Sequence, residues 1–270
     1  MDLAVEYDNR ARVREHPEII ARWAYEAERF RATAGGEFDL EYGARPRNRV
    51  DVFQSAATSA GPLVIFIHGG YWRSFDKSSF SHMAAGALAH GLPVAVPSYS
   101  LCPDATIPDI IAELRQCCLF LWNRIGRPLV VTGHSAGGHL AACLAATRWE
   151  NYGAPPDLIR AGLSASGIFD LRPLMATPLN ADLRLDAVSA VLSSPILWPM
   201  QAKCPFDIWV GGEESCEFLR QSRSLASAWT GLGLAAPYVE LAGANHFSIV
   251  NEFADPRSRL CVRLSELARN

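Results

Sequence analysis

Short, continuous apolar runs alternate along this chain with longer segments in which apolar residues recur every three or four positions. The clearest run, Leu63-Val64-Ile65-Phe66-Ile67, is typical of a strand that is buried on both faces. The clearest helical pattern covers residues 16–33, where charged residues lie opposite an apolar face made of Ile19, Ile20, Trp23, Ala24, Ala27 and Phe30. Strands that alternate with helices predict an α/β fold, with a mainly parallel central sheet and helices on both of its faces.

The same patterns place the other elements along the chain. Strands are predicted at residues 38–42, 49–53, 63–67, 93–96, 128–132, 161–164, 206–210 and 238–241. Helices are predicted at residues 16–33, 79–90, 108–124, directly after the turn at 133–137, and at 185–192, 217–230 and 256–269. Residues 167–203 are otherwise irregular. We therefore predict a single domain over residues 1–270, with an irregular, cap-like insertion at about 171–200.

The composition agrees with one large α/β domain. The 270 residues include 49% hydrophobic ones, enough to fill a buried sheet and its flanking helices. A net charge of -3, without a dense Lys/Arg cluster, gives no reason to expect nucleic acid or a membrane as a partner. No apolar stretch is long enough to span a bilayer, and residues 1–6 lack a signal-peptide pattern. Seven scattered cysteines favour reduced thiols, so we expect a cytoplasmic protein.

The first candidate catalytic residue lies in the segment Gly133-His134-Ser135-Ala136-Gly137. This Gly-x-Ser-x-Gly motif follows an apolar, β-branched run and precedes a helical pattern of small residues. Strand, sharp turn and helix in that order are what a nucleophile elbow requires, with the serine hydroxyl exposed at the tip of a strained turn. The alternative is a glycine-rich turn with an uninvolved serine. A nucleophile elbow needs partners for Ser135 elsewhere in the chain, whereas such a turn does not.

A serine hydroxyl needs a histidine to take its proton and a carboxylate to orient that histidine. His246 lies just past the last predicted strand, late in the chain, and is the predicted base. His134 is expected to pack or to form a hydrogen bond beside the nucleophile. No His-Glu-x-x-His or other metal-binding spacing occurs, so we expect no metal and no cofactor.

The identity of the acid is less sharply determined. Three carboxylates follow strands in suitable places, and position relative to the strand end favours Glu214, then Glu213, then Asp170. Those that are not used would be solvated loop carboxylates.

The oxyanion of the tetrahedral intermediate needs preorganised N–H donors. One is expected from Ala136, directly after the serine. The segment His68-Gly69-Gly70-Tyr71-Trp72, at the end of a predicted strand, is the natural source of the others, and we assign Gly70 and Tyr71. The alternative is that the Gly-Gly pair only forms a turn and donates no hydrogen bond to the oxyanion.

These motifs resemble the α/β-hydrolase superfamily, and within it the kynurenine formamidase (arylformamidase) group of the hormone-sensitive-lipase-like branch. The resemblance rests on His-Gly-Gly-x-Trp at 68–72 and on Gly133-His134-Ser135-Ala136-Gly137-Gly138-His139-Leu140. Further matches span nearly the whole chain: Tyr7-Asp8-Asn9-Arg10-Ala11, Tyr42-Gly43, Arg49-Val50-Asp51-Val52-Phe53, Ser166-Gly167-Ile168-Phe169-Asp170-Leu171, Glu217-Phe218 and Arg220-Gln221-Ser222.

The resemblance implies an α/β-hydrolase fold and the same oxyanion donors, Gly70 and Tyr71. Relatives usually carry an aspartate as the acid where this chain has Glu214. The resemblance also implies that the segment at about 171–200 is a cap or pocket wall. Aromatic side chains expected to line an apolar pocket there are Tyr71, Trp72, Phe169, Trp198 and Phe247, with plain core packing as the alternative for each.

The predicted function is a serine hydrolase that removes a small acyl group, formyl included, from an aryl amide or ester. Ser135, His246 and Glu214 would form its triad, and its partner would be a small-molecule acyl substrate. One alternative is a general short-chain carboxylesterase without formamidase activity. A more remote alternative is a non-catalytic binding protein of the same fold. A homodimer stays open on this sequence.

Overall fold

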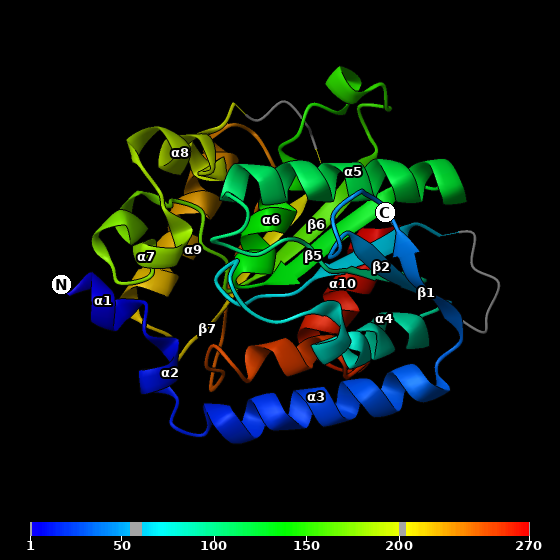
Figure 1. Cartoon of the computed structure of the whole chain (residues 1–270), viewed down its shortest axis with the longest axis horizontal. Helices are drawn as coiled ribbons and strands as arrows, with labels where there is room; N and C mark the ends of the chain where they lie inside the picture. Colours follow the sequence, from blue (N-terminus) through cyan, green and yellow to red (C-terminus); the bar gives the residue numbers. More distant parts are fainter. Residues whose placement is uncertain (1, 55–60, 200–203, 270) are drawn as a thin grey trace.

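Eight strands form one sheet in the computed structural model, which describes residues 2–54, 61–199 and 204–269 (Figure 1). Their order in the sheet is β1-β2-β4-β3-β5-β6-β7-β8. The β1–β2 and β2–β4 pairs are antiparallel, and all other neighbouring pairs are parallel, which confirms the predicted α/β class. The strands are β1 (Gly36–Glu41), β2 (Arg49–Phe53), β3 (Leu63–Ile67), β4 (Val94–Pro97), β5 (Leu129–His134), β6 (Ile159–Ala165), β7 (Phe206–Gly211) and β8 (Tyr238–Leu241).

The continuous apolar run of β3 is explained by the two faces of the sheet. Successive side chains of a strand point to opposite faces. Leu63, Ile65 and Ile67 therefore join the hydrophobic cluster on one face, while Val64 and Phe66 join the cluster on the other. All five residues are buried, so no position of this strand can be polar.

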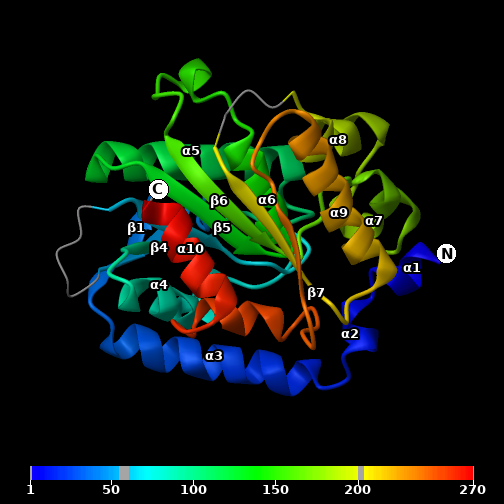
Figure 2. The ribbon, with the colours of Figure 1, turned by 180° about the vertical axis from the view of Figure 1, so that it is seen from behind.

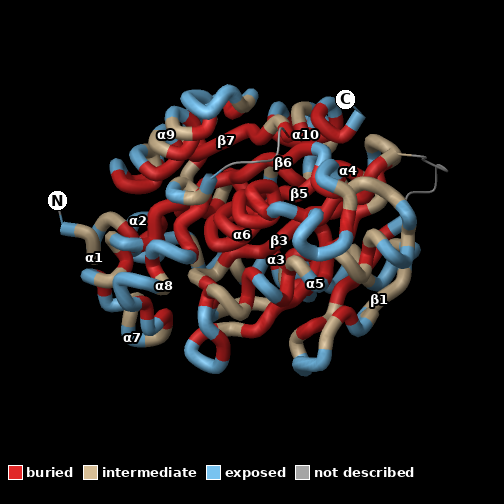
Figure 3. Tube along the Cα trace, turned by 90° about the horizontal axis from the view of Figure 1, so that it is seen from above, coloured by how far each residue is buried: buried red, intermediate tan, exposed pale blue. Residues whose placement is uncertain are grey.

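Helices cover both faces (Figures 1 and 2). On one face lie α5 (Ile107–Ile125), α6 (Ala136–Ala145) and α9 (Cys216–Gly231), and on the other lie α3 (His16–Thr33), α4 (Ala85–Ala89) and α10 (Arg259–Arg269). Helix α10 shows the principle, since its buried residues recur at helical spacing: Leu260, Cys261, Leu264, Leu267 and Ala268. Helix α6 is buried along its whole length, as Figure 3 shows, because its glycine and alanine residues let it pack closely against the sheet.

Several short elements gather at one end of the sheet, at the left of Figure 1. They are α1 (Leu3–Glu6), α2 (Asn9–Arg12), α7 (Asn180–Leu183), α8 (Ala187–Leu192) and the 3₁₀ helix η4 (Arg172–Ala176). Helix η4 contacts α1, α7 and α8, so the start of the chain packs against the segment after residue 171. This segment includes the insertion predicted at about 171–200, whose last residue lies outside the described residues.

One predicted helix differs from the structure. Residues 79–90 were expected to be continuous, but the structure has 3₁₀ helices η1 (Lys77–Ser79) and η2 (Ser81–Ala84) followed by the short α4. The backbone of Phe80, with φ -129°, interrupts the helix. The turn before it is held by the Lys77 ammonium, which is 2.8 Å from the buried Asp51 carboxylate on β2. This contact between distant segments leaves no mark in the local apolar spacing.

Within the described ranges, no helix is both long enough and apolar enough to cross a lipid bilayer.

Candidate active site

Ser135 lies at the sharp turn between β5 and α6. Its φ is 57°, which L residues rarely adopt and which matches the strained tip of a nucleophile elbow. Its N–H donates to the Ala165 carbonyl oxygen at 2.9 Å and so ties the turn to β6. The flanking glycines are required by close packing. A Cβ on Gly133 would lie 2.5 Å from the Gly137 carbonyl oxygen, and one on Gly137 would overlap the Ile67 carbonyl oxygen.

His246 lies in the turn that follows β8, with its Nε2 3.0 Å from Ser135 Oγ. The turn is fixed by Asn245, whose Oδ1 accepts hydrogen bonds from the backbone N–H groups of Phe247 and Ser248, each at 2.9 Å. The ring is therefore held on a rigid turn, in position to accept the serine proton.

His134 supports the same turn from the strand side. Its buried Nε2 is 2.7 Å from the backbone carbonyl oxygen of His246. Burial, and then the proximity of His246, lowers the pKa of His134 well below its usual value. The His134 ring is therefore neutral, and its Nε2–H donates to the backbone that carries His246.

Glu214 follows β7, and both of its carboxylate oxygens are engaged. Its Oε2 is 2.7 Å from His246 Nδ1, on the side of the ring opposite to Ser135. Its Oε1 accepts hydrogen bonds from the Ser166 hydroxyl and from the Gly211 N–H, the latter at 2.8 Å. The carboxylate is fully buried. These contacts fix Glu214, and through it the tautomer and orientation of the imidazole.

The two competing carboxylates lie elsewhere. Glu213 is exposed, and its backbone N–H donates to the Ala244 carbonyl oxygen. Asp170 forms a two-pronged ion pair with Arg172, at 2.8 Å to both Nε and Nη2. Burial raises the pKa of Asp170, but the hydrogen bonds from Arg172 outweigh it and leave the pKa below its usual value. Of the three carboxylates, the structure brings Glu214 to His246.

The loop after β3 packs directly against the serine. A Cβ on Gly69 would lie 3.0 Å from Ser135 Cβ, and the next two residues have positive φ, 108° at Gly70 and 49° at Tyr71. Within the described residues, no protein group accepts a hydrogen bond from the backbone N–H of Gly70, Tyr71 or Ala136. The Ala136 N–H lacks an intrahelical acceptor because it begins α6. These three amides are the predicted oxyanion donors.

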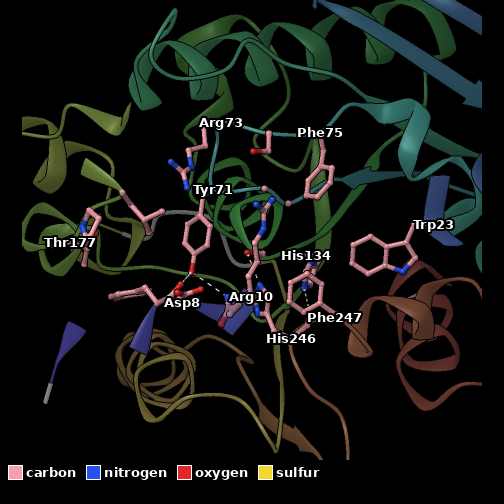
Figure 4. Close-up of a pocket in the computed structure, with 18 of the residues that line it drawn as sticks. Asp8, Arg10, Trp23, Tyr71, Arg73, Phe75, His134, Thr177, His246 and Phe247 are labelled. Atoms are coloured by element: carbon pink, nitrogen blue, oxygen red, sulfur yellow. Dashed lines mark hydrogen bonds between the residues drawn. The ribbon is translucent and has the colours of Figure 1, made fainter. Parts of the chain in front are cut away.

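A cavity of about 270 Å³ opens beside Ser135 and His246 (Figure 4). Its walls come from residues 4 and 7–10, from residues 69–71 and 73–75 in the loop after β3, and from residues 177–179, together with the aromatic side chains of Trp23, Phe80 and Phe247. The volume suits a small, partly aromatic molecule.

The aromatic residues predicted to line the pocket divide into two groups. Tyr71 and Phe247 line the cavity, whereas Trp72, Phe169 and Trp198 do not contribute to its lining. Trp72 and Phe169 are fully buried, and the edge of the Trp72 ring meets His139 at a centroid distance of 5.0 Å. Trp198 is partly buried and donates from Nε1 to the Leu192 carbonyl oxygen at 3.1 Å. These three side chains pack against other residues and do not line the cavity, which was the alternative expected for each of them. Large aromatic rings fill cores well.

Several residues at the site were not singled out by the sequence analysis for roles there. They are Tyr7, Asp8 and Arg10 from the start of the chain, Trp23 on α3, and Ser166 behind Glu214. The only signal for the first three was their place in the motif at 7–11 that carries the family resemblance, which says nothing of their position in space. Trp23 belonged to an apolar helix face, and such a face does not reveal that it ends at a cavity.

No three His, Cys, Asp or Glu side chains within the described residues are grouped so that they could hold a metal ion. The arrangement brings together a serine, a histidine in contact with it, and a buried carboxylate in contact with that histidine.

Comparisons with known proteins agree with this geometry. Residues 50–228 match the family model described as BD-FAE. Kynurenine formamidase of Danio rerio is 30% identical over 236 residues, which cover 84% of this chain and 80% of that protein. Kynurenine formamidase of Salmo salar is 30% identical over 237 residues, with the same coverage.

Solved structures extend the comparison. The crystal structure of a Silicibacter protein, provisionally described as a thioesterase, is 37% identical, with a TM-score of 0.90 over 98% of this chain and 99% of that chain. The esterase EstE5, soaked with p-nitrophenyl butyrate, has a TM-score of 0.74 over 93% of this chain and 90% of its own, at 17% identity. At that identity, EstE5 supports the fold alone.

Proposed function

The chain belongs to the BD-FAE family of α/β-hydrolases and is a hydrolase of the esterase and formamidase kind, and on that premise we propose that it removes a small acyl group from an aryl amide or aryl ester through Ser135. Formyl is the acyl group we propose first, because relatives at 30% identity are kynurenine formamidases. The bond that breaks joins the acyl carbon to the nitrogen or oxygen of an aromatic leaving group.

The reaction proceeds in two halves. Ser135 Oγ attacks the acyl carbon while His246 Nε2 takes its proton, and the tetrahedral intermediate collapses as His246 returns that proton to the departing amine or alcohol. A water molecule then attacks the acyl-enzyme, with His246 as base again, and releases the acid and free Ser135. Glu214 stays ionised and stabilises the imidazolium that forms in each half.

The negative charge of each tetrahedral intermediate develops on the former carbonyl oxygen. We assign the backbone N–H groups of Gly70, Tyr71 and Ala136 to that oxygen, which is supported by their position beside Ser135 and by their lack of an internal acceptor among the described residues. We also propose that part of the segment at 171–199 acts as a cap within a single domain, because Thr177, Pro178 and Leu179 line the cavity.

One observation carries this proposal. A continuous hydrogen-bonded path runs from Ser135 Oγ through both ring nitrogens of His246 to the buried carboxylate of Glu214, at 3.0 and 2.7 Å. A serine held in this way is an activated nucleophile, whereas an uninvolved serine at a glycine-rich turn would need neither neighbour.

The decisive test is Ser135→Ala. We expect turnover of formanilide and of p-nitrophenyl acetate to fall by roughly three orders of magnitude or more, since the nucleophile of the triad is lost. A fluorophosphonate probe should label the parent protein and not the variant. Ser78→Ala, which removes an exposed hydroxyl outside the cavity, is the matched control. Unchanged turnover in Ser135→Ala would refute the proposal, and lack of labelling of the parent would favour a non-catalytic protein.

A general short-chain carboxylesterase is the second candidate, favoured by the match of 38% of this chain, at 34% identity, to isoprenylcysteine alpha-carbonyl methylesterase of Arabidopsis thaliana. The two candidates share the catalytic groups and differ in the acyl bond they cleave. Formanilide and N-formylkynurenine, assayed beside p-nitrophenyl acetate and butyrate, separate them. If the formamides are inert while the esters are hydrolysed, the carboxylesterase assignment holds.

The wider setting follows from the same premise. We propose a small-molecule acyl substrate and no nucleic-acid partner, supported by the small cavity and the net charge of -3. We propose a cytoplasmic location, supported by the free thiols of all seven cysteines. A homodimer stays open, and sedimentation of the purified protein would decide it.

A further inference from the structure

The wall of the cavity contains a part of the chain that lies outside the family match. Ala4, Tyr7, Asp8, Asn9 and Arg10 all line the cavity, whereas the family model begins at residue 50. Ser135, Glu214 and the oxyanion loop lie within the matched residues 50–228, whereas His246 lies outside them, as these wall residues do. Because residues 4 and 7–10 line the cavity, they are placed to contact a substrate that reaches Ser135.

This N-terminal wall, residues 3–12, is firmly anchored. The buried Tyr7 hydroxyl donates to Glu217 at 2.7 Å and accepts from Gln221 at 2.9 Å, which fastens the wall to α9. The Tyr7 carbonyl oxygen accepts a hydrogen bond from the Tyr71 hydroxyl, also at 2.7 Å, which fastens it to the loop beside Ser135. Side chains that leave this wall start from a fixed backbone, so they can select a substrate.

The cavity has three charged side chains in its lining, and they differ in what they contact. Arg73 is paired with Asp182 on α7. Asp8 caps α2, where its Oδ1 accepts from the Ala11 N–H at 3.0 Å. Among the described residues, Arg10 has no ion-pair partner, Asp8 included. Figure 4 shows Arg10 among Asp8, Tyr71 and His246.

Another part of the wall is formed by four apolar aromatic rings, those of Trp23, Phe75, Phe80 and Phe247. A guanidinium without a protein anion, next to such a surface, is a strong donor for a carboxylate, and the pair can form two parallel hydrogen bonds. An aromatic molecule that carries a carboxylate would use both features of the wall.

We propose that Arg10 is a specificity-determining residue that binds a carboxylate on the aromatic leaving group of the substrate. This inference rests on the proposed function, which makes the acyl group small. A formyl or short acyl group has no room for a charged substituent, so the anion belongs to the aromatic part. The substrate class is then aryl amides or aryl esters that bear a carboxylate.

The test compares two matched esters, phenyl acetate and 4-carboxyphenyl acetate. The parent protein should favour the carboxylated ester in kcat/KM, and Arg10→Gln should lower that preference roughly tenfold or more, the size expected for a charge-assisted hydrogen bond. Arg10→Lys should keep part of the preference, since it keeps the charge and loses the fork. Arg14→Gln, at an exposed arginine that does not line the cavity, should leave both rates unchanged.

A binding measurement keeps the inference separate from the proposed function. Calorimetric titration of benzoate and of benzamide into Ser135→Ala should show tighter binding of benzoate, and Arg10→Gln in that background should remove the difference. The inference would be overturned if Arg10→Gln kept both the higher kcat/KM for the carboxylated ester and the tighter binding of benzoate. If neither ester is hydrolysed by the parent, the proposed function fails, while the titration still decides the role of Arg10.

Discussion

At the scale of single residues, the environment of Glu214 explains how a glutamate can occupy the acid position. Its side chain is one methylene longer than that of aspartate, and the extra reach is taken up by contacts on the far oxygen. Ser166 and the Gly211 N–H hold Oε1, which leaves Oε2 directed at His246. A carboxylate held at both oxygens orients the imidazole as firmly as a shorter one would.

This predicts a sharp difference between two adjacent glutamates. Glu214→Gln should lower kcat by roughly three to four orders of magnitude, because a neutral amide neither stabilises the imidazolium nor enforces its tautomer. Glu213→Gln, the same change at an exposed neighbour, should stay within about twofold of the parent. The measurement is steady-state hydrolysis of p-nitrophenyl acetate. Comparable losses in the two variants would contradict the assignment of Glu214.

At the scale of elements, the closeness of α6 to the sheet depends on two positions without side chains, Gly133 in β5 and Gly137 in α6. The two glycines face each other and the Ile67 carbonyl oxygen across a gap that no Cβ fits. This closeness sets the angle at which β5 leads into α6, and with it the position of Ser135 at the cavity.

Two glycine substitutions test this packing. Gly137→Ala should lower the free energy of unfolding by about 3 kcal/mol, because the new methyl group overlaps rigid backbone that cannot move aside. Gly231→Ala, at the end of α9, meets no atom within 4 Å and should be neutral or stabilise by up to about 1 kcal/mol. Urea unfolding measures both, and equal effects would show that the contact with β3 is not tight.

At the scale of the whole molecule, the sequence was informative wherever a local pattern sets the structure. The runs at residues 49–53, 63–67 and 238–241 are strands with the predicted bounds, and α3 begins and ends as predicted. The contact of His246 with Ser135 agrees with the expected order of the residues, because strand ends meet at one edge of a parallel sheet.

The cavity was harder to predict, and the reason is distance along the chain. Trp23 and Arg10 reach a cavity beside Ser135 from more than a hundred positions away, and no local spacing around either residue predicts a cavity. Conversely, Trp72 and Phe169 belong to motifs that carry the family resemblance, yet both side chains are buried in the core. Local spacing predicts that a side chain is buried, but not whether it is buried against a cavity or against other side chains.

Acid should destabilise the whole molecule earlier than its carboxylates alone would require, because burial lowers the pKa of four of its histidines. Burial lowers the pKa of His68, His82 and His139 to about 4, and it lowers the pKa of His134 well below its usual value. The unfolded chain, in which histidine has its ordinary pKa near 6.5, therefore binds more protons below about pH 6.5. Stability is fully present above that pH and is lost as the pH falls toward 4, by up to about 1.4 kcal/mol per pH unit for each histidine.

Urea unfolding at a series of pH values between 8 and 4.5 measures this loss, and His139→Gln isolates one contribution. At pH 8 the variant reports only the cost of changed packing around the hydrogen bond to the Ser193 carbonyl oxygen. Below about pH 6.5 its stability should fall less steeply than that of the parent, by up to about 1.4 kcal/mol per unit. Parallel curves would show that the ring of His139 is not held neutral in the folded protein.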